Sequence, residues 1–311
     1  MKFFDLLFIY IMMVLLVLVG VGFFTLLERK VLGYVGNRKG PNKVMILGLG
    51  QPLVDGLKLF SKEYILPFKS VYLIFMLCPV LMILLSLLMW LCMPLMNHFV
   101  DFKYGLLFFM AVTGMSVYAL IFSGWSSNSK YSIFGGYRGV AQTISYEVSL
   151  SLVMLSFVML VGGYNLEYFS IYQDSIWMIV FMLPLSMIWL VSMLAETNRT
   201  PFDFAEGESE LVSGFNVEYS GIFFVFIFIG EYSSIMFMSG LYVILFLGGL
   251  SYLYMFKVLL MILLFILIRG TLPRFRYDNL MNLAWKIYLP TAIHFLFFFL
   301  GFKMFLYVFM L

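Results

Sequence analysis

The sequence is poor in charge and in the residues that bind metal ions. Charged side chains make up 11% of its 311 residues, and it contains only two cysteines and two histidines. Cys78 and Cys92 do not form a C-x-x-C pair, and His98 and His294 lie far apart in the sequence. Glycine-rich phosphate and dinucleotide motifs are missing as well. We therefore expect the chain to hold no metal, iron–sulfur cluster or flavin, and no covalently bound cofactor.

The scarcity of charge also limits the class of protein. A soluble globular domain has about 25% charged and about 45–50% apolar residues, whereas 63% of this sequence is hydrophobic. A soluble fold could not bury that much apolar surface. The net charge is +3 and no basic tract is interleaved with aromatic residues, so nucleic-acid binding is not expected. Lipid is the solvent that fits this composition.

Long apolar runs recur along the chain. A helix rises about 1.5 Å per residue and the hydrocarbon core is about 30 Å thick, so one span needs roughly 20 residues. The first run is longer than the hydrophobic part of a signal peptide, which is about 7–15 residues, so we predict a transmembrane helix there. The sequence predicts an all-α polytopic membrane protein, one integral membrane domain over residues 1–311, with eight transmembrane helices at 6–27, 71–93, 104–124, 144–163, 176–195, 220–247, 252–268 and 287–309.

Lysine and arginine indicate how these spans are oriented. Basic residues concentrate in the inner loops of membrane proteins. An even number of spans places four connections on one side, and fifteen of the 19 basic residues fall in them. The other four are Lys2, Lys103, Lys257 and Lys303. We therefore predict that both termini are outside and that the inner loops are 28–70, 125–143, 196–219 and 269–286.

The first inner loop contains an amphipathic segment. Over residues 51–64 apolar residues recur at helical spacing, while Asp55, Lys58 and Lys62 fall on the other face. Pro52 suits a first helical turn. We predict a helix that lies flat at the membrane interface, with a surface helix of a small extramembrane domain as the alternative. The basic residues beside it fit equally well with a signal that only sets topology.

The third inner loop is acidic, against the trend of the other inner loops. Residues 195–219 contain six acids and one arginine. Thr200 and the proline after it resemble a helix start, and on such a helix Asp203, Glu206 and Glu210 would share one face. One interpretation is a solvated acidic loop. The other is a carboxylate cluster in which some members stay protonated, and the phenylalanines between the acids favour it.

Two further acids fall inside predicted spans. Glu147 lies a few residues into the fourth span, and Glu231 lies roughly 16 Å below the inner end of the sixth. A charge at that depth costs several kcal/mol, so an intramembrane acid is often functional, for example in a proton relay. A structural carboxyl bonded to neighbouring Tyr or Ser residues is the alternative. Together with Glu196, the two acids form a series from the inner face toward the membrane centre, which favours proton movement.

The last inner loop is rich in arginine. Arg269, Arg274 and Arg276 could hold an anionic headgroup, a carboxylate of a partner, or the acidic loop. Arg269 lies at the predicted membrane edge, where it would meet a polar ligand arriving from lipid.

These polar segments carry a resemblance to a known family. They closely resemble the chain 1 family of mitochondrial NADH–ubiquinone oxidoreductase (complex I), with the look of an arthropod copy. The matching segments spread over the whole chain and are 27–34 (LERKVLGY), 38–44 (RKGPNKV), 141–149, 195–219 and 269–278 with Trp285-Lys286.

The resemblance implies a location and partners. It implies a core subunit in the mitochondrial inner membrane that joins the hydrophilic arm to the membrane arm, with termini in the intermembrane space and long loops in the matrix. Ubiquinone would be the substrate, with electrons arriving from an iron–sulfur cluster on a partner. The implied partners are the hydrophilic quinone-site subunits on the matrix side, the small and antiporter-like membrane subunits, and membrane lipids.

The resemblance also implies two groups of site residues, neither of them catalytic in itself. One group would line the ubiquinone channel and consists of Arg29, Phe228, Tyr232 and Arg269. The other would form a carboxylate path that couples quinone reduction to proton translocation, and it consists of Asp55, Tyr146, Glu147, Glu196, Asp203, Glu206, Glu208, Glu210 and Glu231.

Two other functions compete with this hypothesis. A stand-alone proton-coupled secondary transporter often shows inverted repeats with paired broken helices. No convincing repeat is present, and the polar residues gather at one face. A purely structural anchor would leave the buried acid Glu231 without a role.

Overall fold

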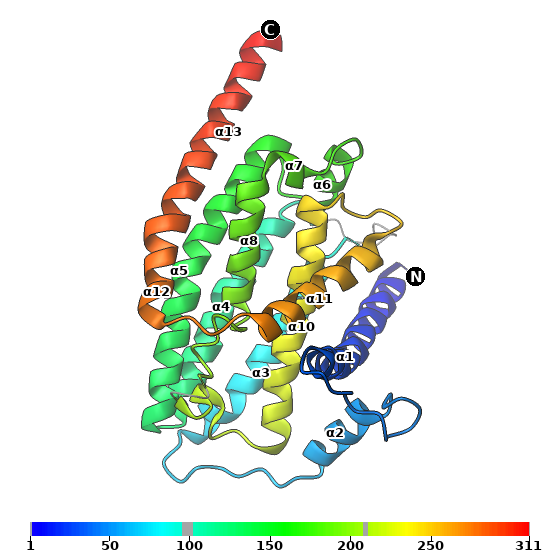
Figure 1. The fold of residues 1–311 in the computed structure, drawn as a ribbon, viewed down its shortest axis with the longest axis vertical. Coiled ribbons are helices and arrows are strands. Elements are labelled where there is room, and N and C mark those ends of the chain that lie inside the picture. The colour runs from blue at the N-terminus through cyan, green and yellow to red at the C-terminus, as the bar shows by residue number, and fades with distance from the viewer. Residues whose placement is uncertain (1, 95–101, 208–210, 311) are drawn as a thin grey trace.

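The computed structural model describes residues 2–94, 102–207 and 211–310, and within them it is a bundle of helices without strands (Figure 1). Seven helical segments in this part of the chain are long and apolar enough to cross a membrane. The all-α class is therefore confirmed. Six of them are α1 (Lys2–Val35), α3 (Tyr72–Met89) with its 3-10 extension η1 (Trp90–Cys92), α4 (Gly105–Ser126), α5 (Lys130–Val161), α10 (Gly221–Phe246) and α11 (Tyr254–Thr271). The seventh is the continuous run of α12 (Tyr277–Asn282), the π-helical η3 (Leu283–Tyr288) and α13 (Leu289–Met310).

The predicted fifth span, 176–195, is interrupted. It consists of α7 (Met178–Phe181) and α8 (Leu183–Glu196), separated at Met182. Pro184 suits the first turn of α8, but it has no N–H for the Val180 carbonyl and its ring would clash with that carbonyl, so α7 does not continue into α8. Alone, α8 is about 21 Å long, less than the hydrocarbon thickness. The count of eight spans therefore stays a prediction.

Two predicted loop features are wrong. Residues 130–143, predicted as a loop, form the first turns of α5, because hydropathy detects only the apolar part of a helix that continues past the lipid. The helix predicted to start at Thr200 is replaced by turns up to residue 207. Backbone carbonyls there have distant partners: Gln142 Nε2 donates to the Phe202 carbonyl at 2.7 Å, and the Phe275 amide donates to the Pro201 carbonyl at 3.1 Å.

The break predicted between the sixth and seventh spans is confirmed. The chain leaves α10 at Leu247 and starts α11 at Tyr254. Gly248 and Gly249 both have positive φ, 86° and 55°, which favours glycine over residues with a β-carbon. Gln173, after the short helix α6 (Leu166–Tyr172), closes this end of α10 by donating to the Ile244 carbonyl at 2.9 Å.

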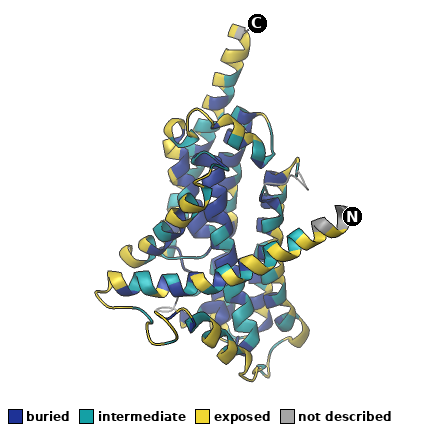
Figure 2. Cartoon of the chain, turned by 90° about the vertical axis from the view of Figure 1, so that its right-hand side faces the viewer, coloured by how far each residue is buried: buried dark blue, intermediate teal, exposed yellow. Residues whose placement is uncertain are grey.

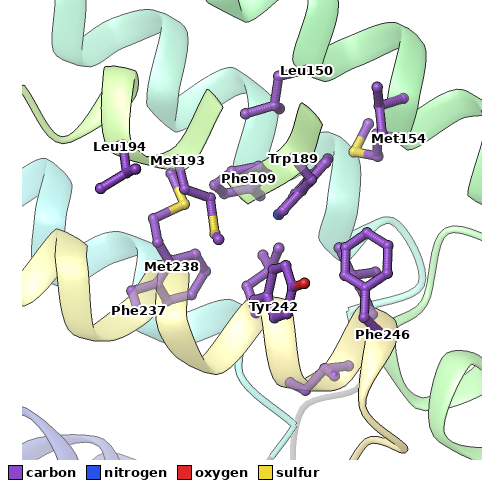
Figure 3. Packing of buried hydrophobic residues seen from close by; sticks show 14 of the residues in the cluster. Phe109, Leu150, Met154, Trp189, Met193, Leu194, Phe237, Met238, Tyr242 and Phe246 are labelled. Carbon is purple, nitrogen blue, oxygen red and sulfur yellow. The ribbon is translucent and has the colours of Figure 1, made fainter. Parts of the chain in front are cut away.

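The core lies where α5, α8 and α10 meet (Figure 3). Trp189 of α8 and Phe246 of α10 pack at a ring-centroid distance of 6.4 Å, and Phe109 of α4 packs on Phe237 at 5.8 Å. By contrast α1 lies at the edge of the bundle and is exposed along much of one side (Figure 2). Such exposed apolar sides are expected where helices face lipid.

The amphipathic helix predicted over 51–64 is present in its first part. Helix α2 (Gln51–Phe60) starts with Pro52 in its first turn, packs beside α1 and α10, and ends four residues before Tyr64. It lies near the start of α10, at the end of the bundle away from the C-terminus (Figure 1). Its position at a membrane interface stays a prediction.

Candidate functional site

A cavity of about 530 Å³ lies between α1, α2, α10 and the end of α11. All four residues predicted for the ligand channel, Arg29, Phe228, Tyr232 and Arg269, line this cavity, although they come from three helices. Most of its wall is apolar, with Leu18 and Val21 from α1 and further apolar side chains from α2 and α10. A concave, mainly apolar site with a few polar groups is the usual form of a small-molecule site.

Aromatic rings form one wall of this cavity. Phe224, Phe228 and Tyr232 follow one another at four-residue spacing and therefore share a face of α10. Their ring centroids lie 4.4 Å and 6.2 Å apart in turn, and Phe24 of α1 packs on Tyr232 at 5.0 Å. The wall leads along α10 toward the charged part of the cavity.

An exposed ion pair lies on the α2 side of the cavity. Arg29 Nη1 donates to Asp55 Oδ2 at 2.5 Å, and Gln51 Nε2 donates to the other carboxylate oxygen at 2.8 Å. Asp55 was predicted to belong to the carboxylate path. It lies in the wall of this cavity with a base as its partner, and its place in that path stays a prediction.

A buried carboxylate, Glu28, connects the ligand-channel residues. Tyr232 donates its hydroxyl to Glu28 at 2.6 Å, Arg269 forms a short ion pair with the same carboxylate, and Arg199 approaches it at 3.5 Å. Glu28 is only 5% exposed. A charge in such a place is costly unless it is paired and hydrogen-bonded, and here two guanidinium groups and a hydroxyl provide the partners. Glu28 and Arg199 were not among the predicted site residues, although an acid directly after the first apolar run was a signal for Glu28.

Arg199 extends this network away from the cavity. Its guanidinium carbon lies 4.4 Å from the centre of the Tyr232 ring. Its Nε and Nη2 atoms are buried and have no hydrogen-bond partner in the described part of the chain. Burial alone would lower the pKa of Arg199, but the surrounding Tyr232, Glu28 and Glu231 raise it above its ordinary value. Arg199 is therefore a fixed positive charge.

A second, smaller cavity of about 80 Å³ lies on the other side of α10. Glu231 of α10 and Glu196 at the end of α8 both line it, together with Ser116, Ser234 and Asn198. Glu147 of α5 lies close by: a β-carbon on Gly114 of α4 would be 3.0 Å from its Oε1. The Glu147 and Glu196 carboxylates are within electrostatic range of each other. The structure thus brings together the three acids predicted as a series, and none of them forms an ion pair within the described ranges.

In the third inner loop Asp203 is buried and Glu206 is half-buried, so neither is a freely solvated acid. Asp203 pairs with Arg274 at 3.3 Å, and Glu206 accepts a hydrogen bond from Asn216 Nδ2 at 2.7 Å. Burial and the adjacent Asp203 raise the pKa of Glu206 to about 7. Burial also raises the pKa of Asp203, although Arg274 opposes this. Glu208 and Glu210, predicted for the same path, lie outside the described residues.

Tyr146 lies apart from these acids, in the wall between α5, the acidic loop and η3. Its ring packs on Phe202 at 5.8 Å and on Tyr288 at 6.1 Å. It is fully buried, and its hydroxyl has no hydrogen-bond partner among the residues that the structure describes. Tyr146 therefore precedes Glu147 in the sequence, but its hydroxyl is not hydrogen-bonded to any described acid.

The chain is similar to known proteins over most of its length. A family model described as NADH dehydrogenase matches residues 8–300. NADH-ubiquinone oxidoreductase chain 1 of Anopheles gambiae is 57% identical over 297 residues, 95% of each chain. The same-named proteins of Locusta migratoria and Sarcophilus harrisii are 54% and 47% identical, over 94% and 89% of this chain and 94% and 90% of theirs. Among the described residues, no group of three or more His, Cys, Asp or Glu side chains could hold a metal ion.

Proposed function

Because the chain belongs to the NADH dehydrogenase family, we propose that its larger cavity binds ubiquinone and that the carboxylates behind it couple quinone reduction to proton translocation. The chain is a membrane subunit of NADH:ubiquinone oxidoreductase, complex I, and a multi-pass protein of the mitochondrial inner membrane. Its partners are other subunits of that complex.

One observation carries the proposal. Arg29, Phe228, Tyr232 and Arg269 come from three helices and line one cavity with a long apolar wall and a charged part. Ubiquinone has the matching chemistry, an apolar tail and a polar headgroup with two carbonyl oxygens. The tail fits the aromatic wall of α10, and the guanidinium groups are donors for the carbonyl oxygens.

The network around Glu28 provides the link to protons. Reduction of ubiquinone takes up two electrons and two protons, and the electrons arrive from an iron–sulfur cluster on a partner subunit. Negative charge that develops on the quinone competes with Glu28 for Arg269, and a change there reaches Arg199, which contacts both Glu28 and Tyr232. Charges interact more strongly in such a desolvated setting than in water.

The acids behind Arg199 are the groups that can respond. Glu231 lies within electrostatic range of Arg199, Glu206 and Asp203, and it shares the smaller cavity with Glu196. A group whose pKa lies near the working pH can both take up and release a proton, and the pKa of Glu206 is about 7. We propose the path from Asp203 and Glu206 through Glu231 and Glu196 to Glu147.

The orientation and the remaining partners belong to the same proposal. The termini would lie in the intermembrane space and the basic loops in the matrix, in line with the bias of basic residues. The hydrophilic quinone-site subunits would dock on the matrix side. The antiporter-like and small membrane subunits would receive the carboxylate path. A stand-alone transporter is disfavoured, since relatives at 47–57% identity are chains of an oxidoreductase.

The test is a pair of arginine variants in the assembled complex. Arg269→Ala removes a cavity cation and should raise the apparent KM for quinone about tenfold, the loss of about 1.4 kcal/mol of binding. Arg276→Ala is the matched control, because Arg276 is 80% exposed and pairs with Asp278 outside the cavity. An unchanged KM in the Arg269 variant, or an equal rise in both variants, would contradict the quinone site.

A further inference from the structure

Helix α2 presents three different faces. Pro52, Asp55, Gly56 and Leu59 line the larger cavity. The opposite side carries exposed apolar side chains, including Leu53 at 67% and Leu57 at 70% exposure. Because positions three and four apart share a helix face, this apolar face is continuous over the length of α2. The third face carries the only basic residue of the helix, Lys58.

Exposed apolar side chains also occur in the segments on either side of α2. Before the helix, Met45, Ile46 and Leu47 are exposed, and after it Ile65 and Phe68 are exposed as well. Burying one such side chain is worth about 1.5–3 kcal/mol, so a surface of this size facing water would be strongly unfavourable. Something apolar therefore covers it.

Basic residues border this apolar face. Lys58 on α2 and Lys62 just after it are exposed, and neither forms an ion pair with any described residue. The acid on the same helix, Asp55, is occupied by Arg29. Two unpaired lysines next to an apolar surface match a molecule that has both an anionic group and apolar chains.

We propose that α2 and its flanking segments bind an anionic phospholipid. The phosphate lies between Lys58 and Lys62, and the acyl chains cover Leu53, Leu57 and the neighbouring apolar residues. A lipid is favoured over a protein partner because α1, against which α2 packs, is itself exposed and apolar along its length, so the lipid-facing surface is continuous. An amphipathic helix with lysines beside its apolar face binds an anionic bilayer surface in this way.

The position of α2 gives the lipid a consequence, which rests on the proposed function. The helix that binds lipid on one side forms the cavity wall on the other. A lipid that holds this wall in place favours quinone binding, and quinone then favours lipid binding by the same factor.

The experiment uses the assembled complex in phosphatidylcholine vesicles that contain photoactivatable phosphatidylglycerol. The probe should label residues 53–62. The double variant Lys58→Gln/Lys62→Gln should reduce this labelling about 30-fold, since each lysine near an anionic surface contributes about fivefold. Lys58→Arg/Lys62→Arg should retain it. Lys130→Gln/Lys286→Gln, at two exposed lysines of α5 and η3, is the matched control and should also retain it.

Three outcomes would overturn the proposal. One is equal labelling of the wild type and the Gln double variant. The second is an equal loss in the Lys130 and Lys286 control, which would indicate a general effect of charge. The third is a photoactivatable residue at position 57 that crosslinks to a protein subunit, which would make this surface a subunit interface.

Two further measurements separate this inference from other failures. Raising the salt concentration should weaken labelling of the wild type. This test needs no variant, so it does not depend on how well the variants assemble. Labelling does not depend on turnover, so it stands if the Arg269→Ala test fails. Conversely, anionic vesicles should lower the apparent KM for quinone in the wild type and not in the Gln double variant.

Discussion

The carboxylates in the two cavities that flank α10 differ in whether they have a basic partner. In the larger cavity Glu28 is paired with Arg269 and Arg199, and Asp55 is paired with Arg29. In the smaller cavity Glu231 and Glu196 have no basic partner in the described part of the chain. A carboxylate held between arginines stays ionised and fixes geometry, whereas a buried one without a base can hold a proton. One cavity is therefore suited to binding and the other to proton exchange, with Arg199 between them.

The largest effect is expected from removing the charge of Glu28, which breaks its ion pairs in the larger cavity. Glu28→Gln leaves two guanidinium groups without their carboxylate, and removing one partner of a buried pair typically costs about 3–5 kcal/mol. Thermal denaturation of the assembled complex should show this loss, together with loss of quinone-dependent turnover. Asp278→Asn, in an exposed pair, should leave both unchanged. A Glu28→Gln complex with wild-type stability would show that the pairing is not structural.

In the smaller cavity, Glu231→Gln should leave stability unchanged but reduce turnover. The amide has nearly the same shape as the protonated acid, so assembly and stability should be retained. Quinone-dependent NADH oxidation should fall at least about tenfold, because a group that exchanges protons typically contributes a factor of 10²–10⁴. Asp174→Asn, an exposed acid on the predicted outer side, should have no effect on turnover. Normal turnover and proton translocation in the Glu231 variant would exclude the relay.

The pH dependence of stability gives a further test, through the pKa of Glu206. Its pKa is raised from the model-peptide value of 4.5 to about 7. The folded state therefore holds this proton more tightly than the unfolded state, and its contribution to stability is fully present below pH 4.5 and is lost as the pH rises through about 7.

The wild type should therefore lose stability relative to Glu206→Gln between pH 4.5 and about 7, as measured by Tm at a series of pH values. Asp203→Asn should move this window to lower pH, because the neighbouring negative charge contributes to the shift. A difference in Tm that does not depend on pH would contradict the raised pKa of Glu206.

The smallest effect is expected at the exposed ion pair of the larger cavity. Arg29 and Asp55 have side chains that are 53% and 33% exposed, and such pairs contribute up to about 1 kcal/mol. Asp55→Asn should change the Tm of the complex little and the apparent KM for quinone by a few-fold at most. An effect as large as that of Glu28→Gln would mean that exposure is a poor guide to the role of these pairs.

The helical membrane architecture and the break at Gly248-Gly249 followed from hydropathy and glycine, which act locally. The start of α5 did not, because the polar residues 130–143 gave no apolar signal. The acidic loop did not either. Thr200 and Asp203 favour a helix start, but partners from α5 and from the loop before α12 take the backbone groups that such a helix would have used.

The sequence alone determined that this chain is a helical membrane protein with Glu231 inside an apolar span. These properties depend on the transfer of single side chains and short segments from water to lipid. Only the tertiary structure decided which acids have a base: it joined Glu28 to arginines 171 and 241 residues away, placed Asp55 beside Arg29 in the wall of the larger cavity, and left Glu231 without an ion pair in the described part of the chain. Pairing of this kind depends on contacts between distant helices, and no local pattern encodes it.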